Sequence, residues 1–164
     1  MAASEGDGIT ISEAITLQDI DTIRTLFLEY AESLDFSLCF QGFDDELALL
    51  PGKYNPPAGR LLLATGSKAG IVGCVGIRPI GTTDAEMKRL YVRPAFRGLA
   101  LGKRLAAEAV TFARDTGYAA LRLDTIADSM AAAEQLYRDM GFIETPPYYE
   151  NPVVGATLYS LDLK

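Results

Sequence analysis

The residues at positions 97–104 have the types and the spacing that suit the binding of a phosphate group. Their sequence is Arg-Gly-Leu-Ala-Leu-Gly-Lys-Arg, between a predicted strand that ends at Val92 and a predicted helix. Backbone N–H groups in the first turn of a helix have no intrahelical partner, and the helix dipole adds partial positive charge there. A glycine in that turn lets an anion approach the backbone closely. The segment therefore predicts a phosphate site at a helix start.

Two common phosphate-binding motifs do not match this segment. A P-loop has four residues between its glycines and then Lys-Ser or Lys-Thr, whereas three residues separate Gly98 from Gly102 and Arg104 follows Lys103. The dinucleotide-binding pattern G-x-G-x-x-G is also absent from the sequence. The sequence therefore predicts neither a P-loop nucleotide-binding protein nor a dinucleotide-binding enzyme.

Basic residues gather around this segment although the chain as a whole is acidic. The chain has 15 Lys and Arg residues against 22 Asp and Glu residues, and its net charge of −7 disfavours a general nucleic-acid binder. The stretch 88–104 contains no acidic residue but six basic ones, which are Lys88, Arg89, Arg93, Arg97, Lys103 and Arg104. These are either a solvated strand edge and helix start or a local anion site.

Missing residue types exclude several kinds of chemistry. The chain has no histidine, which excludes a Ser-His-Asp triad, a Cys-His pair and a histidine-ligated zinc site. Cys39 and Cys74 are the only cysteines, too few for a four-cysteine metal site, so no metal is predicted. A single bridge between them is left open, although two lone thiols are more typical of a reducing cytosol. The first nine residues do not resemble a secretory signal and no apolar stretch could span a membrane, so a cytoplasmic protein is predicted.

Periodicity and turn residues predict the elements that position the phosphate segment. With 164 residues we expect one domain, residues 1–164, in which residues 1–8 are a flexible tail. Helices are expected at 17–34, 44–50, 99–116 and 130–140, with Thr16 as an N-cap. Strands are expected to begin at Ile9 and to cover 61–64, 70–77, 85–92, 119–125 and 156–163. The hairpins imply antiparallel pairing and the strand–helix–strand unit at 85–125 implies parallel pairing, so the fold class is mixed α/β.

Three blocks of the sequence, in this order, resemble the GNAT-type N-acetyltransferase superfamily. Residues 86–94 resemble its central strand, residues 97–102 match its R-x-x-G/A-x-G pattern, and residues 136–142 resemble its L-Y-x-x-x-G-F signature. The predicted helix and strand between the last two blocks also fit, and the similarity extends from about Ile9 to Leu163. The resemblance implies a mostly antiparallel sheet with a central, splayed parallel strand pair, flanked by helices.

The resemblance also implies acetyl-CoA as co-substrate, bound where the two parallel strands diverge. Leu90, Tyr91 and Val92 would pair with the pantetheine arm, and one of their N–H groups would polarise the thioester carbonyl. The residues that would hold the pyrophosphate through backbone N–H groups are Arg97, Gly98, Leu99, Ala100, Leu101, Gly102 and Lys103. Two positions depart from the pattern. Ala100 replaces a commoner glycine, which is permissible if that residue has a helical φ, and Met130 stands where an asparagine is common.

Proton transfer would fall to carboxylates or tyrosines, because acetyl transfer needs a neutral amine and the departing thiolate benefits from a proton. On the resemblance, Glu86 is the candidate base, directly or through a water, with Asp84 a weaker one. The structural alternative for Glu86 is an ion pair with Lys88 or Arg122.

The resemblance makes Tyr137 the candidate general acid beside the thioester sulfur. The structural alternative is a core position beside Ala133 and Met140, which share its predicted helix face.

The acceptor implied by the resemblance is a primary amine of a small molecule or peptide. Candidates for its walls, by location alone, are Tyr30, Asp35, Phe36, Phe40, Tyr148, Tyr149, Glu150 and Asn151. Neither a membrane nor a nucleic acid is an expected partner, and a homodimer is left open. The alternative function is a non-catalytic module that binds acyl-CoA.

Overall fold

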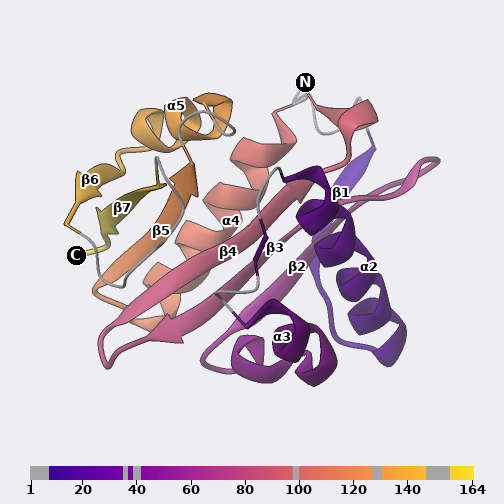
Figure 1. Cartoon of the computed structure of the whole chain (residues 1–164), viewed down its shortest axis with the longest axis horizontal. Coiled ribbons are helices and arrows are strands. Elements are labelled where there is room, and N and C mark those ends of the chain that lie inside the picture. The colour runs from indigo at the N-terminus through magenta and orange to yellow at the C-terminus, as the bar shows by residue number, and fades with distance from the viewer. Residues whose placement is uncertain (1–7, 35–36, 39–41, 98–99, 127–130, 147–155) are drawn as a thin grey trace.

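The computed structural model describes residues 8–34, 37–38, 42–97, 100–126, 131–146 and 156–164. The strands are β1 (Ile9–Glu13), β2 (Arg60–Gly66), β3 (Gly70–Ile80), β4 (Asp84–Val92), β5 (Ala120–Ile126), β6 (Ile143–Thr145) and β7 (Ala156–Asp162). The helices are α2 (Leu17–Ser33), α3 (Phe43–Leu49), α4 (Leu101–Thr116) and α5 (Ala131–Asp139), with short 3-10 turns at η2 (Gly52–Tyr54) and η3 (Pro94–Phe96). Figure 1 shows their arrangement.

One seven-stranded sheet carries the fold, in the order β1-β2-β3-β4-β5-β7-β6. The pair β4–β5 is parallel and the other neighbouring pairs are antiparallel. β4 and β5 pair only from Asp84 to Glu86 and from Ala120 to Arg122, although both strands continue beyond. The expected mixed sheet with a splayed parallel pair is therefore confirmed.

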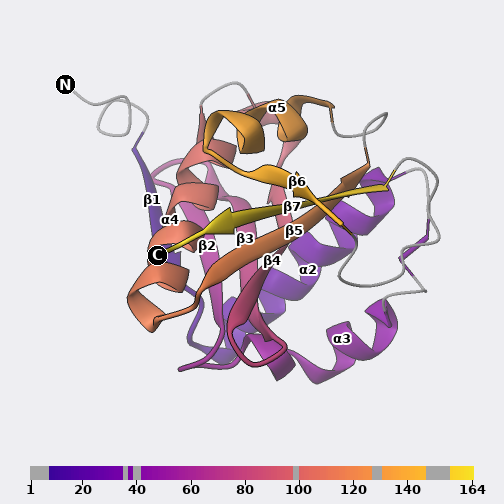
Figure 2. The same cartoon turned by 90° about the vertical axis from the view of Figure 1, so that its left-hand side faces the viewer.

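Helices cover both faces of the sheet, and each face has its own apolar core (Figure 2). On one face α4 and α5 bury side chains such as Leu105, Ala109 and Tyr137 against the strands. On the other face α2 buries Ile23, Leu26 and Phe27, which repeat at helical spacing. The sheet thus lies between two layers of helices. The diverging ends of β4 and β5 belong to the middle of this sheet.

Most element boundaries agree with the expected ones, and the differences have local causes. Thr16 caps α2 as predicted, because its hydroxyl accepts the Asp19 N–H at 3.0 Å while the Asp19 carboxylate accepts the Thr16 N–H at 3.1 Å. The tail was expected to include Gly8, but the Gly8 carbonyl accepts the Ser67 N–H at 3.0 Å beside β1. Residues 1–7 lie outside the described part of the chain.

The described residues also bear on membrane-spanning helices, metal-ligand clusters and the two cysteines. No helix in the described residues is both long and apolar enough to cross a bilayer. Among those residues, no three or more His, Cys, Asp or Glu side chains gather as a metal would require. Cys74 is a buried free thiol whose Sγ donates to the Arg89 carbonyl at 3.5 Å, so the bridge left open by the sequence does not form. Cys39 lies outside the described residues.

Candidate functional site

A short turn connects β4 to the start of α4 and holds the candidate phosphate segment. Arg97 Nε donates to the Val92 carbonyl at 3.0 Å, which closes the turn over η3. The helix begins at Leu101, two residues later than the sequence predicts. Gly98 and Leu99, which were expected to hold the pyrophosphate, lie outside the described residues. The described members of the segment are Arg97, Ala100, Leu101, Gly102 and Lys103.

Ala100 is the N-cap of α4, and its backbone is left-handed, with φ +60° and ψ +19°. The condition under which alanine was acceptable at this position, an ordinary right-handed helical φ, is therefore not met. A left-handed conformation brings the alanine Cβ too close to the next carbonyl oxygen, at a cost of about 1–2 kcal/mol. Alanine also has no side-chain oxygen with which to cap the N–H groups of the first turn.

Replacing Ala100 with glycine is expected to raise the free energy of unfolding by about 0.5–1 kcal/mol. The gain is the strain of about 1–2 kcal/mol that glycine relieves, reduced by the roughly 0.4–1 kcal/mol of extra entropy that glycine gives the unfolded chain. Urea unfolding of Ala100→Gly measures it. The matched control is Ala107→Gly, at an exposed position inside α4, which should lose about 1 kcal/mol. Equal losses in both variants would contradict the strain at Ala100.

Gly102 lies in the first turn of α4, where its lack of a side chain is not required by packing. A Cβ built at this position would meet only Leu136 Cδ2 at 3.7 Å, an ordinary van der Waals distance. Glycine costs a helix interior about 1 kcal/mol relative to alanine. The open space above the turn is therefore suited to a ligand that approaches the backbone, such as a phosphate group.

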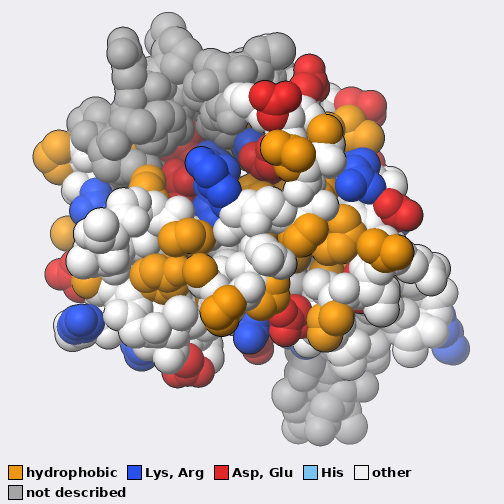
Figure 3. Space-filling model, turned by 90° about the horizontal axis from the view of Figure 1, so that it is seen from below, with side chains coloured by type: hydrophobic (Ala, Val, Ile, Leu, Met, Phe, Trp, Pro, Cys, Tyr) orange, Lys and Arg blue, Asp and Glu red, His pale blue; other side chains and the backbone are white. Residues whose placement is uncertain are grey.

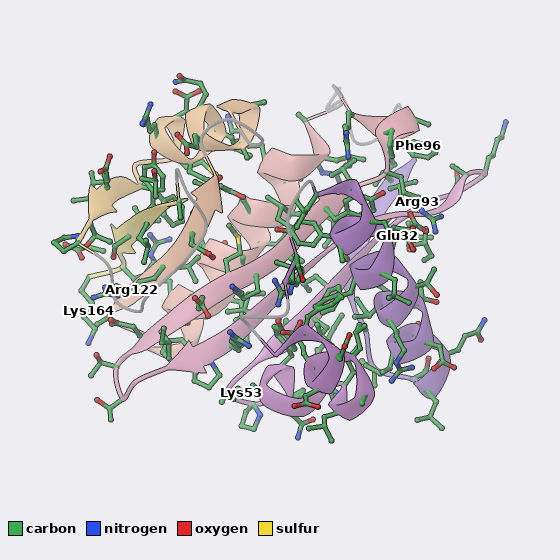
Figure 4. The ribbon with its side chains drawn as sticks, in the orientation of Figure 1. Glu32, Lys53, Arg93, Phe96, Arg122 and Lys164 are labelled. Carbon is green, nitrogen blue, oxygen red and sulfur yellow. The ribbon has the colours of Figure 1, made fainter. Side chains whose placement is uncertain are left out.

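The basic stretch 88–104 is largely neutralised by acidic partners in the structure. Lys88 Nζ lies 3.3 Å from Asp124 Oδ1, and Arg89 Nη2 lies 3.0 Å from Glu46 Oε1. Arg93, which Figure 4 shows beside α2, pairs with Glu29 at 2.7 Å. The interpretation of all six basic residues as one anion site is therefore too broad.

The basic side chains nearest the start of α4 are Arg97, Lys103 and Arg104. Arg104 Nη2 donates to the Ile9 carbonyl at 2.9 Å and so ties α4 to β1. On the face seen from below in Figure 3, Lys and Arg side chains are interspersed with acidic ones. With Arg104 engaged by the Ile9 carbonyl, an anion site at the start of α4 would rely mainly on backbone N–H groups.

A β-bulge interrupts β4 just beyond its last pair with β5. Cys74 of β3 faces Tyr91 and Gly76 faces Lys88, so the two residues Arg89 and Leu90 oppose one residue of β3. Arg89 has φ +61°, a rare value for a residue other than glycine. The bulge bends β4 where Leu90, Tyr91 and Val92, the expected pantetheine contacts, begin.

The expected pantetheine contacts send their side chains to both faces of the sheet. Leu90 and Val92 pack against the core on the α4 face. Tyr91 belongs to the other core, where its ring meets Tyr30 edge-on at 6.2 Å. Their backbone therefore lies at the splay while their side chains anchor it from both sides.

An ion pair crosses the gap between the diverging strands. The Lys88 and Asp124 side chains are 4% and 12% exposed, and they join β4 to β5 where backbone pairing has stopped. Burial lowers the pKa of Lys88, and the neighbouring Asp124 carboxylate opposes that shift. Asp124 is a residue of the site that was not predicted from the sequence. Its alternation with Leu121 and Leu123 in a predicted strand was the available signal, because it puts Asp124 on the opposite face.

Glu86 is buried on the same face of the sheet, with only 2% of its surface exposed. Its Oε1 accepts a hydrogen bond from Arg78 Nε at 3.1 Å. Arg78 is therefore a partner that the structural alternative did not name, while Lys88 pairs with Asp124 at 3.3 Å and Arg122 pairs with Asp84 at 2.9 Å. Asp84, the weaker candidate base, is therefore engaged by Arg122.

Tyr137 is held by the way α5 ends. Gly141, with φ +100°, lets the Phe142 N–H return to the Tyr137 carbonyl at 3.0 Å and the Gly141 N–H to the Arg138 carbonyl at 3.0 Å. This is a Schellman motif, and it brings the Phe142 ring within 5.8 Å of the Tyr137 ring. The L-Y-x-x-x-G-F block therefore fixes the position of the tyrosine ring.

The Tyr137 residue is 6% exposed and makes no hydrogen bond through its hydroxyl with the described residues. Burial raises the pKa of this hydroxyl, and the nearby Tyr30 and Asp124 add to the shift. The hydroxyl is therefore protonated at neutral pH, which is the state that a general acid needs. Ala133 and Met140 pack against the same core, as the structural alternative expects.

The expected acceptor walls fall mostly on residues that the structure does not describe, namely Asp35, Phe36, Phe40, Tyr148, Tyr149, Glu150 and Asn151. Met130 also lies outside the described residues. Tyr30 is described, near the end of α2, and burial raises its pKa to about 12. The Tyr30 hydroxyl adds to the raised pKa of Tyr137, and the Asp124 carboxylate adds to the raised pKa of both tyrosines.

Comparison with known proteins agrees with this geometry. The model of the acetyltransferase (GNAT) family matches residues 21–142. An uncharacterized N-acetyltransferase from Schizosaccharomyces pombe is 40% identical over 156 residues, which cover 94% of this chain and 95% of that protein.

Two solved structures share the fold. A GNAT-family acetyltransferase from Staphylococcus aureus has a TM-score of 0.77 at 21% identity, covering 95% of this chain and 99% of that one. The Salmonella typhimurium protein yncA, solved with its cofactor acetyl-CoA, has a TM-score of 0.70 at 19% identity, covering 96% and 95%. From the family match and the Schizosaccharomyces pombe relative, this chain belongs to the GNAT family and is an N-acetyltransferase.

Proposed function

We propose that this chain transfers the acetyl group of acetyl-CoA to a primary amine of a small molecule or peptide, by direct attack in a ternary complex. The observation that carries the proposal is the alignment of two features on β4 and α4. A strand edge is left open where β4 parts from β5, and a helix start with an unobstructed Gly102 follows that strand. An extended pantetheine arm ending in a pyrophosphate suits the two in succession.

Each end of the donor has a matching group in the chain. Backbone N–H groups at Ala100, Leu101, Gly102 and Lys103 would face the pyrophosphate, together with the segment from Arg97 through Gly98 and Leu99. Leu90, Tyr91 and Val92 would pair with the pantetheine amides along the open edge of β4. The Salmonella typhimurium protein of the same fold, solved with acetyl-CoA, supports this donor.

The reaction joins the amine nitrogen to the thioester carbonyl carbon and breaks the bond from that carbon to sulfur. An N–H group of the 90–92 segment would stabilise the oxyanion of the tetrahedral intermediate. The Tyr137 hydroxyl would give its proton to the departing thiolate, and Glu86, directly or through a water, would take the proton that the amine loses.

A binding assay followed by an acceptor screen tests the proposal. At a hundredfold excess over its dissociation constant, acetyl-CoA should stabilise the folded protein by about 2.7 kcal/mol, which appears as a higher melting temperature. ATP and NAD are the controls, and stabilisation by either of these but not by acetyl-CoA would contradict the proposal. A panel of amines and peptides is then tested for CoA release. Binding of acetyl-CoA without turnover on the whole panel would favour a non-catalytic acyl-CoA module.

Glu86→Gln tests the candidate base. We expect kcat/KM to fall about tenfold. This loss is smaller than the usual 10²–10⁴-fold contribution of acid–base catalysis, because part of the amine binds in its neutral form and needs no base. The affinity for acetyl-CoA should change little. A variant with the wild-type kcat/KM would return Glu86 to a structural role such as its ion pair with Arg78.

A further inference from the structure

Arg89 occupies a backbone conformation that its residue type does not favour. Its φ of +61° lies in the left-handed region, which is strained for a residue with a Cβ because the Cβ approaches the next carbonyl oxygen. The neighbouring register shows why the conformation persists as a bulge, since Arg89 and Leu90 together face one residue of β3. Such strain remains only where surrounding contacts impose it.

Two residues of α3 hold the Arg89 side chain. Glu46 receives Arg89 Nε at 3.1 Å and Nη2 at 3.0 Å, a two-point contact that fixes the plane of the guanidinium. Phe43, one turn earlier on α3, presents its ring 5.1 Å from the same group. The Arg89 and Glu46 side chains are only 2% and 8% exposed, so water screens this pair little.

Glu46 is itself fixed by further partners. The Tyr54 hydroxyl donates to Glu46 Oε2 at 3.0 Å, and Arg78 Nη1 lies 3.7 Å from Oε1. Arg78 in turn binds Glu86, the candidate base. The paired charges lower the pKa of Glu46 against the opposing effect of its burial, so the carboxylate is ionised at neutral pH. A rigid acceptor is thus available to hold the bulge residue.

We propose that Glu46 is a positioning residue of the acetyl-transfer site: through its grip on the Arg89 guanidinium it keeps β4 bulged, so that an N–H group of the 90–92 segment points at the thioester carbonyl. The inference rests on the proposed function. It extends that function to α3, a helix that contributes no residue to the expected donor site. The ion pair would offset the backbone strain at Arg89 and give the oxyanion donor its direction.

Two substitutions at Arg89 separate this role from plain stabilisation. Arg89→Ala and Arg89→Gly remove the same guanidinium and leave Glu46 with the same remaining partners, Tyr54 and Arg78. They differ in the backbone, because glycine adopts positive φ readily and alanine does not. The bulge should survive in the glycine variant and relax in the alanine variant. Glu46→Gln, which weakens the grip and keeps the Arg89 side chain, should resemble the alanine variant.

Infrared difference spectroscopy with acetyl-CoA labelled with ¹³C at the thioester carbonyl reads the oxyanion contact without an acceptor. A hydrogen bond to the carbonyl lowers its stretching frequency, so the band of the bound donor should lie below that of free acetyl-CoA. We expect wild type and Arg89→Gly to share this displacement, and Arg89→Ala and Glu46→Gln to lose at least about half of it. Melting curves and calorimetric titration of each variant establish that the spectra report folded, saturated protein.

The possible outcomes are distinct. Equal displacement in all four proteins would overturn the inference, because the bulge would then need no grip from α3. Loss in both Arg89 variants would also overturn it, because the guanidinium itself, and not the backbone, would then act on the donor. Wild-type protein that does not bind acetyl-CoA would instead overturn the proposed function. If Glu46→Gln fails to fold, comparison of Arg89→Ala with Arg89→Gly still shows whether the guanidinium contacts hold the bulge.

Discussion

Tyr137→Phe is expected to slow acetyl transfer by about 10²-fold or more while leaving the fold and the binding of acetyl-CoA intact. Phenylalanine keeps the ring that packs beside Phe142, and it removes only the hydroxyl. Because burial raises the pKa of that hydroxyl, wild-type Tyr137 is protonated across the neutral range and can deliver a proton to the thiolate. Without it the thiolate must leave unaided.

Tyr159→Phe is the matched control for this substitution. Tyr159 is fully buried, and its hydroxyl donates to Glu134 at 3.3 Å and accepts from Arg138 at 2.9 Å, which is a structural role. Its removal should cost about 1 kcal/mol of stability with the rate unchanged. Melting temperature and single-turnover rate, measured on both variants with an acceptor from the amine panel, compare the two tyrosines.

Leaving-group chemistry adds a second test of Tyr137. An acyl donor whose thiol has a lower pKa needs less protonation, so the loss in Tyr137→Phe should shrink with such a donor. A structural tyrosine would produce no such dependence. An unimpaired rate at saturating donor, with chemistry shown to limit turnover, would end the assignment of Tyr137 as general acid.

The parts of this site that the sequence predicts are those encoded by local patterns. Helix periodicity and the glycine after it located α5, and the Schellman motif at Gly141 explains why the tyrosine lies four residues before that glycine. The capping box at Thr16 and Asp19 is equally local. Such features depend on neighbours within one helical turn, and the sequence displays those neighbours directly.

The parts that the sequence does not predict depend on partners far along the chain. Arg89 pairs with Glu46 from 43 positions away and Lys88 with Asp124 from 36 positions away. No local signal in the sequence marks Arg89 as the left-handed residue of a bulge. None marks Ala100 as a left-handed N-cap either. The strand β6, three residues long, is too short for an alternating pattern to indicate it. Register and side-chain pairing across the sheet decide these features.

Gly102→Glu is expected to weaken acetyl-CoA binding by about 10²-fold or more, because a carboxylate beside the pyrophosphate adds a like-charge contact that costs several kcal/mol. It also places side-chain atoms where the donor would meet the first turn of α4. Isothermal titration with acetyl-CoA measures the loss, and the rise in melting temperature with acetyl-CoA should disappear. Wild-type affinity in a folded Gly102→Glu protein would move the phosphate site away from α4.

Gly102→Ala makes the same test sharper, because its effects on stability and on binding are expected to have opposite signs. The added Cβ meets only Leu136 Cδ2 at an ordinary 3.7 Å, so the free protein should gain about 1 kcal/mol of stability from better helix propensity. The same methyl group would stand between the ligand and the backbone N–H groups, and it should weaken acetyl-CoA binding about tenfold through lost hydrogen bonds of roughly 1 kcal/mol each. If Gly102 served only chain flexibility, the substitution would not raise stability and weaken acetyl-CoA binding at the same time. Urea unfolding of the free protein and calorimetric titration of the same sample decide it: a variant both more stable and equally tight for acetyl-CoA would show that Gly102 is not part of the donor site.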